Sequence, residues 1–145
     1  MPFPSSRSRA PRPDIDPIRS ADEALAVLSV AITQPLVHET MSFVLDASGR
    51  GNTVTVVSGT NRPDMVVDIA ECLAVAAATK PRARSIVLAS VRPDSGMLPG
   101  DVDRWLEASA IVDQHGLVLL EWFVIGPMGP ECPRDLLGEP ERWPD

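Results

Sequence analysis

The stretch Ser85-Ile-Val-Leu-Ala-Ser-Val-Arg-Pro-Asp-Ser-Gly-Met-Leu-Pro-Gly-Asp-Val-Asp103 decides the fold. Its first part is an apolar run that predicts a buried strand over residues 85–90. A loop rich in Pro and Gly follows, and a helix is predicted to open near Asp101. Loops at strand ends in α/β sheets can direct polar groups into a crevice, so this loop is the first candidate for a site.

Apolar periodicity extends the same alternation of strands and helices in both directions from this stretch. Ser20-Ala-Asp-Glu23 is a capping box that predicts a helix start. We expect helices over residues 20–33, 64–79 and 101–114, and strands over residues 40–46, 52–58, 85–90 and 117–125. The fold class is therefore α/β (α+β), with one domain built on a mixed β-sheet flanked by helices.

Two finer expectations concern the faces of the helices. Cys72 falls on a face of the second helix that the pattern predicts to be buried. The buried stripe of the third helix is expected to contain these residues: Val102, Trp105, Leu106, Ile111 and Val112.

The 145 residues are enough for one domain with a proper core. Pro clusters near both ends of the sequence, which predicts tails around a compact centre. We expect a disordered Pro/Arg/Ser-rich tail over residues 1–19, the folded domain over residues 20–126, and a Pro-rich tail over residues 127–145.

The charge distribution bears on the class of partner. The formal charge is −7. Four arginines and two aspartates give the first twenty residues a charge of +2, which leaves −9 for the rest. An acidic body argues against nucleic-acid binding, which needs clustered Lys and Arg. No apolar run approaches a membrane span. Two cysteines without a framework fit a reduced, cytoplasmic location.

The segment from Ser90 to Asp103 resembles the metal-site segment of the RadC-like proteins of the JAB/JAMM (MPN) metalloprotease superfamily. In that family the segment reads His-x-His-Pro, a Ser/Gly/Pro loop, and Ser-x-x-Asp. Without a gap, Pro93 and Pro99 match family prolines and Asp103 matches the ligand Asp. The segment Gly116-Leu-Val-Leu-Leu-Glu-Trp-Phe-Val-Ile-Gly126 is similar to a family strand. The resemblance covers about residues 39–126 and implies a JAB/JAMM (cytidine-deaminase-like) architecture.

In the family, two His and one Asp hold Zn²⁺, a Glu acts as base, and a Ser stabilises the oxyanion. This sequence has Ser90 and Arg92 at the two His positions and Gly100 at the Ser position. His38 stands at the Glu position and Glu39 follows it, so Glu39 reaches the site only through a bulge. A catalytic zinc site needs three protein ligands, and a fixed guanidinium charge repels the ion. We therefore expect no metal, no cofactor and no catalytic residue.

Further downstream, Glu121 and Trp122 replace an Asp-His pair of the family. Trp122 either packs between helix and sheet or serves as an anchor at an interface. Arg92 is expected to fill the space of the lost cation and to pair with Asp103. The alternative is that its guanidinium fork holds an anionic ligand or a carboxylate terminus.

Three functional hypotheses remain open on the sequence. The first is a catalytically inactive RadC/JAB-like domain (a pseudoenzyme) that binds an unknown protein partner or acts as a scaffold, through the sheet edge, Trp122 and the Pro-rich tails. The second is a hydrolase with a displaced metal site made of His38, Glu39 and Asp103. The third is a binder of a small anion that uses Arg92. The sequence favours a protein that is not an enzyme and leaves homo-oligomerisation open.

Overall fold

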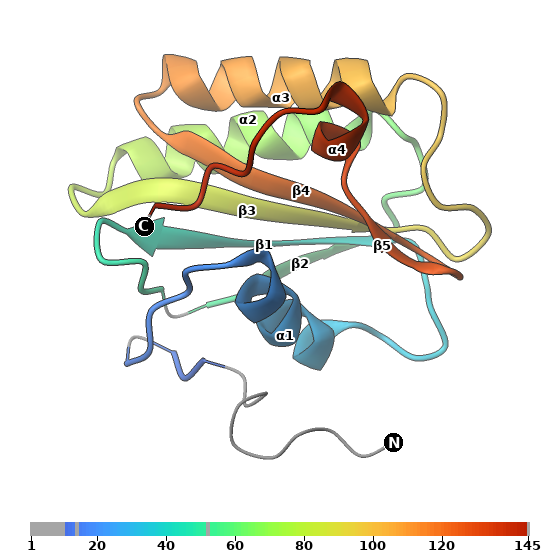
Figure 1. Ribbon diagram of the computed structural model, residues 1–145, viewed down its shortest axis with the longest axis horizontal. Coiled ribbons are helices and arrows are strands. Elements are labelled where there is room, and N and C mark those ends of the chain that lie inside the picture. The colour runs from blue at the N-terminus through green and yellow to red at the C-terminus, as the bar shows by residue number, and fades with distance from the viewer. Residues whose placement is uncertain (1–10, 14, 52, 145) are drawn as a thin grey trace.

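The computed structural model describes residues 11–13, 15–51 and 53–144. Four helices and five strands alternate along these residues (Figure 1). In chain order they are α1 (Ala21–Ala31), β1 (Glu39–Asp46), β2 (Thr55–Ser58), α2 (Met65–Ala78), β3 (Ala83–Val91), α3 (Asp101–Gln114), β4 (Val118–Gly126), β5 (Gly129–Glu131) and α4 (Pro133–Leu137). Each of the three helices and four strands expected from the periodicity is present, with ends that differ by at most three residues.

The five strands form one mixed sheet in the order β2-β1-β3-β4-β5. β1 pairs antiparallel with both β2 and β3, whereas β3 and β4 run parallel and β5 returns antiparallel to β4. The parallel pair is connected through α3, as a crossover between parallel strands requires. The structure is therefore a mixed α+β fold, in agreement with the expected class.

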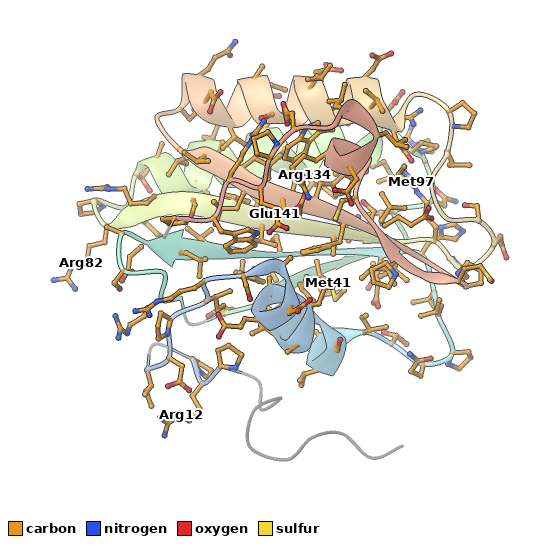
Figure 2. The ribbon with its side chains drawn as sticks, viewed as in Figure 1. Arg12, Met41, Arg82, Met97, Arg134 and Glu141 are labelled. Atoms are coloured by element: carbon orange, nitrogen blue, oxygen red, sulfur yellow. The ribbon has the colours of Figure 1, made fainter. Side chains whose placement is uncertain are left out.

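Helices cover both faces of the sheet (Figure 1). α2 and α3 lie side by side on one face, where Trp105, Trp122 and Leu119 are fully buried. α1 covers the other face, and Met41 lies between the sheet and α1 (Figure 2). Because successive residues of a strand point to opposite faces, the apolar strands β3 and β4 supply both cores at once.

Two predictions about the helices, the capping box of α1 and the burial of Cys72, can be compared with the structure. Ser20 caps α1 by accepting the Glu23 amide at 3.2 Å, and the Glu23 carboxylate accepts the Arg19 amide at 2.7 Å. The capping box is thus confirmed, one residue displaced on the returning side. Cys72 is exposed, so its predicted burial was wrong, and it and Cys132 are free thiols.

Residues 127–144 form part of the fold, whereas the sequence predicted only a Pro-rich tail. β5 extends the sheet, and α4 packs beside α3 at the edge of β4 (Figure 1). Arg134 of α4 lies between that helix and the sheet (Figure 2), where its Nε donates to the Glu121 carboxylate at 3.0 Å. Both side chains are buried, and Glu121 is 0 % exposed. This ion pair fastens the C-terminal segment to the sheet.

Burial raises the pKa values of two groups at this pair, the Glu121 carboxyl and the Cys132 thiol. Desolvation raises the pKa of Glu121 above its ordinary value, although Arg134 acts in the opposite direction. Desolvation also raises the pKa of the neighbouring Cys132 thiol to about 12, so this cysteine stays protonated at neutral pH and is a poor nucleophile.

Two further expectations concern the N-terminal region and membranes. Residues 1–10 and 14 of the predicted disordered tail lie outside the described residues. Nearby, Ile18 is buried in the core beneath α1, so the ordered domain begins before residue 20. Within the described part of the chain, no helix combines the length and apolar character of a membrane span.

Arg134→Ala should destabilise the fold, and more at pH 8 than at pH 5. The substitution leaves Glu121 buried without its cation, at a cost of about 3–5 kcal/mol when the carboxylate is ionised. Because the pKa of Glu121 in the folded state is already raised and rises further without Arg134, stability falls as pH increases. Urea unfolding at the two pH values measures the difference.

The exposed Arg82 provides the matched control, and Arg82→Ala should change the free energy of unfolding little at either pH. A double variant, Glu121→Leu with Arg134→Leu, removes both charges and should recover most of the lost stability. Equal destabilisation by Arg134→Ala at both pH values would contradict the role given to the buried carboxylate.

Candidate functional site

A small polar pocket opens at the end of β3, between the start of β1, the loop after β3 and the N-terminus of α2. Its volume is about 40 Å³, enough for only a few water-sized groups. The polar side chains that line it are His38, Thr40, Thr60, Asn61, Arg62, Ser90, Arg92 and Ser95. The structure thus brings three of the six sequence-predicted site residues, His38, Ser90 and Arg92, to one pocket.

Arg92 is the central side chain of this region and is only 5 % exposed. Its Nη1 donates to Asp101 Oδ2 at 2.7 Å and its Nη2 donates to Asp101 Oδ1 at 3.1 Å. Nη1 also donates to the carbonyl oxygen of Gly96 at 3.0 Å. This two-point pairing of a guanidinium with a carboxylate is the strongest geometry available to an arginine ion pair. The predicted partner was Asp103, and the prediction was wrong.

Asp101 binds Arg92 because α3 places it on the buried face of its first turn. Its carboxylate also accepts the Leu98 amide at 2.6 Å and Nη1 of Arg104 at 2.8 Å. Burial alone would raise the pKa of Asp101, but the hydrogen bonds from Arg92 and Leu98 outweigh it and hold the pKa below its ordinary value. The positive end of the helix dipole favours the same charge.

Asp103 lies two residues further along α3 and is exposed to solvent. In a helix a step of two residues turns a side chain by about 200°, so Asp101 and Asp103 face opposite directions. Gly100 caps the helix with a left-handed backbone, at φ 92°, that glycine adopts without strain. Neither Asp103 nor Gly100 contributes a side chain to the pocket.

The loop between β3 and α3 is held against the end of β4. A Cβ atom on Gly126 would lie only 2.5 Å from the carbonyl oxygen of Ser95, so glycine permits this close approach. Arg104 continues the network beyond the loop, because its Nε donates to Asp64 at 2.7 Å. The ends of β3 and β4 and the starts of α2 and α3 are thereby joined.

Ser90 is engaged by Trp122, whose indole Nε1 donates to the Ser90 hydroxyl at 2.9 Å. The Trp122 ring is 0 % exposed, and its centroid lies 5.8 Å from the Arg92 guanidinium carbon. The possibility that Trp122 anchors an interface is therefore wrong for this conformation, because its surface is already covered. Ser90, Trp122 and Arg92 form one packed unit.

His38 and Glu39 separate onto opposite faces of the sheet. Glu39 pairs with Val91 in register, and no bulge interrupts β1 between Glu39 and Leu45. Its carboxylate accepts the amide of Thr33 at 2.9 Å and the Thr33 hydroxyl at 3.0 Å, on the side of α1. His38 lines the pocket instead. Its Nδ1 is buried without a hydrogen-bond partner, and its Nε2 lies 3.8 Å from Asp94 Oδ2.

The displaced metal site proposed from His38, Glu39 and Asp103 is not assembled, since these side chains point to three different environments. Across residues 11–13, 15–51 and 53–144, no three His, Cys, Asp or Glu side chains are grouped closely enough to hold a metal ion. Apart from His38, the polar side chains of the pocket are guanidinium, hydroxyl and amide groups, which are poor ligands for Zn²⁺.

Sequence reasoning missed four of the residues that organise these sites, namely Asp101, Arg104, Glu121 as an ion-pair partner, and Arg134. A signal existed for Asp101. The apolar residues Trp105, Ala108 and Val112 recur at helical spacing from position 101, which places Asp101 on the buried stripe. Leu106 was assigned to that stripe but is largely exposed.

Comparison with known proteins identified no relative of this chain. No protein-family model matches the chain, and no curated protein or solved structure matches it. Any statement of function therefore rests on the residues and their geometry.

Arg92→Ala and Asp101→Asn should both lower the free energy of unfolding strongly, by about 3–5 kcal/mol for the alanine variant, because a buried charge loses its partner. Asp103→Asn, two residues away and exposed, should change it by less than about 0.5 kcal/mol. Urea unfolding at neutral pH tests all three. If Arg92→Ala left the free energy of unfolding unchanged, Arg92 would be assigned to ligand binding and not to stabilising the fold.

The same pair should make stability depend on acid pH. The pKa of Asp101 is lowered in the folded state, so its contribution is complete above the unfolded-state pKa of about 3.9 and is lost as pH falls through the folded-state value. The stability of the wild type should therefore fall below about pH 4 more steeply than that of Asp101→Asn. Parallel slopes in unfolding experiments from pH 6 to pH 3 would refute this.

Proposed function

We propose that the chain is a catalytically inactive RadC-like domain of the JAB/JAMM superfamily that acts as a protein-binding or scaffolding module. The observation that carries the proposal is the buried Arg92–Asp101 pair, with Arg92 at the position that the resemblance assigns to a metal-binding His. The mixed five-stranded sheet between α1 and the α2–α3 layer is compatible with that architecture.

The chemistry of the pocket supports inactivity. A guanidinium carries a permanent positive charge at neutral pH and offers no lone pair to a metal. The Ser90 hydroxyl already accepts a hydrogen bond from Trp122, and Asp103 faces solvent. A single internal ion pair thus takes the place where a metalloprotease would gather three ligands and a water molecule.

The edge strand β2 is the surface that best suits a protein partner. All four of its residues are exposed, including Val56 and Val57, and only one side of the strand is paired, with β1. Neither Pro nor a charged side chain interrupts it, although such residues commonly protect sheet edges. An extended segment of a partner could add to the sheet here through backbone hydrogen bonds.

A second candidate function is the binding of a small anion in the polar pocket. Arg62 is exposed at its rim, and the buried Nδ1 of His38 has no partner. Against this candidate, both terminal nitrogens of Arg92 are committed to Asp101, which neutralises the charge that an anion would seek. The protein-binding function is therefore preferred.

The purified full chain, incubated with Zn²⁺ and dialysed, should retain far less than one zinc per chain, because the pocket offers no set of three ligands. Elemental analysis by mass spectrometry measures the content. Stoichiometric zinc that is lost in His38→Ala or Asp103→Asn would overturn the inactive assignment. A thermal shift with inorganic phosphate that disappears in Arg62→Gln would favour the anion-binding function.

Val57→Lys should abolish a stable complex with a partner protein, because a charged side chain opposes the addition of a strand at this edge. Val75→Lys, on the exposed face of α2, is the matched control and should leave the complex intact. Quantitative affinity purification from the native cell compares the two variants with the wild type. A partner retained equally by both variants would place its contact elsewhere, and the absence of any reproducible partner would overturn the module.

A further inference from the structure

A larger pocket lies at the other end of the sheet, where β1 ends and β3 and β4 begin. Its volume is about 350 Å³, which falls in the range of small-molecule sites. In Figure 1 this end of the sheet is at the left, where the chain also ends. The residues that decide its character are Ile18, Leu45, Val118, Leu120, Arg84 and Pro144.

The floor of this pocket is apolar. Ile18, Leu45 and Leu120 belong to the core that α1 covers further along the sheet, and each is almost completely buried. Val118 is 41 % exposed at the start of β4 and brings apolar surface to the mouth. Side chains from three separate segments therefore converge on one cavity that an apolar group can enter from solvent.

The rim of the pocket carries an uncommitted positive charge. Among the described residues, the Arg84 guanidinium donates only to nearby backbone carbonyl oxygens, those of Pro81 at 3.3 Å and Ala83 at 3.2 Å. An adjoining cleft of about 280 Å³ shares Arg84 with the pocket and adds Arg82. Figure 2 shows Arg82 projecting from this end of the sheet. Neither arginine forms an ion pair with an acid in the described residues.

The other charged groups at the pocket have hydrogen-bond partners of their own. Asp46 Oδ1 accepts the amide and hydroxyl of Ser48 at 2.8 Å and 2.6 Å and the amide of Arg50 at 3.0 Å. Arg142 is bound to Glu139 and to the carbonyl oxygen of Leu119. Arg82 and Arg84 thus have no acidic partner in the described residues, as Arg62 has none at the other pocket, and they lie beside an apolar cavity in a chain whose body is strongly acidic.

We infer that this pocket binds a small amphipathic carboxylate, with the apolar body on Ile18, Leu45 and Leu120 and the carboxylate at Arg84. Apolar burial supplies affinity, and a guanidinium at the mouth selects an anionic head group. The inference does not depend on the proposed function, because the pocket lies at the opposite end of β3 from Arg92.

Trp143 offers a direct readout. It packs on the same apolar core, and its neighbours in the sequence, Arg142 and Pro144, both line the pocket. Its indole Nε1 is buried without a hydrogen-bond partner. The other two tryptophans, Trp105 and Trp122, are fully buried elsewhere. Binding should therefore change the fluorescence of Trp143, and the change should be absent in Trp143→Phe.

The test compares octanoate with octanol, which share an apolar chain and differ in charge. Titration of the full chain, followed by tryptophan fluorescence and by amide chemical shifts, should give tighter binding of octanoate by about fivefold, as expected for an exposed ion pair. Arg84→Gln should reduce octanoate to the affinity of octanol. Arg62→Gln, at the other end of the sheet, is the matched control and should have no effect.

A second variant tests the apolar mouth of the pocket. Val118→Glu places a negative charge at the mouth and should abolish binding of octanoate, whereas Val75→Glu on α2 should not. Circular dichroism checks that each variant is folded. Equal affinity for acid and alcohol, insensitivity to Val118→Glu, shifts confined to residues outside the pocket, or no binding at millimolar octanoate would each overturn the inference. Such a result would leave the proposed function untouched, because that function is tested separately by the zinc content and by Val57→Lys.

Discussion

The ion pair between Arg92 and Asp101 is the interaction on which the arrangement around the polar pocket depends. It joins the residue after β3 to the first residue of α3 across a loop that has no regular structure of its own. The same two side chains also bind the loop, through the Gly96 carbonyl oxygen and the Leu98 amide. Arg104 then extends the network to the start of α2. One buried pair therefore sets the geometry of a loop and two helix ends.

The buried pairs Arg92–Asp101 and Arg134–Glu121 both join an arginine to a carboxylate, but they shift the pKa of the carboxyl group in opposite directions. Asp101 stands at a helix N-terminus and accepts from two arginines and a backbone amide, so its pKa is lowered. Glu121 stands within a strand and has Arg134 as its main donor, so desolvation prevails and its pKa is raised. The first pair favours the ionised state throughout the physiological range. The second holds the C-terminal segment with a carboxylate that tolerates a proton.

The sequence predicted most of the helices and strands, but it did not predict which charged side chains pair with one another. Apolar patterning placed β1, β2, β3 and β4, and capping signals placed α1, because these depend on neighbours along the chain. The pairing of Arg92 required knowing the rotational phase of α3. Matching positions to a motif selected Asp103, whereas the packing of Trp105 and Val112 against the sheet turns Asp101 inward.

The C-terminal segment shows a second limit. Its high Pro content predicts a tail, yet Arg134 reaches a buried glutamate that lies thirteen residues earlier in the sequence. Nothing local to either residue indicates that contact. Tertiary pairing of charges can therefore order a segment whose composition alone suggests that it remains free.

The phase of α3 also bears on the proposal that the domain is catalytically inactive, because it concerns the orientation of a whole helix and not only Ser90 and Arg92. Trp105, Ala108 and Val112 pack against the sheet on the same side as Asp101. Turning Asp103 toward the pocket would rotate this apolar stripe by about 200° into solvent. Exposing the stripe would lose the free energy of its burial, so histidines at positions 90 and 92 alone would not complete a site of three ligands. The arginine stabilises a helix orientation in which the carboxylate of a metal site has no place.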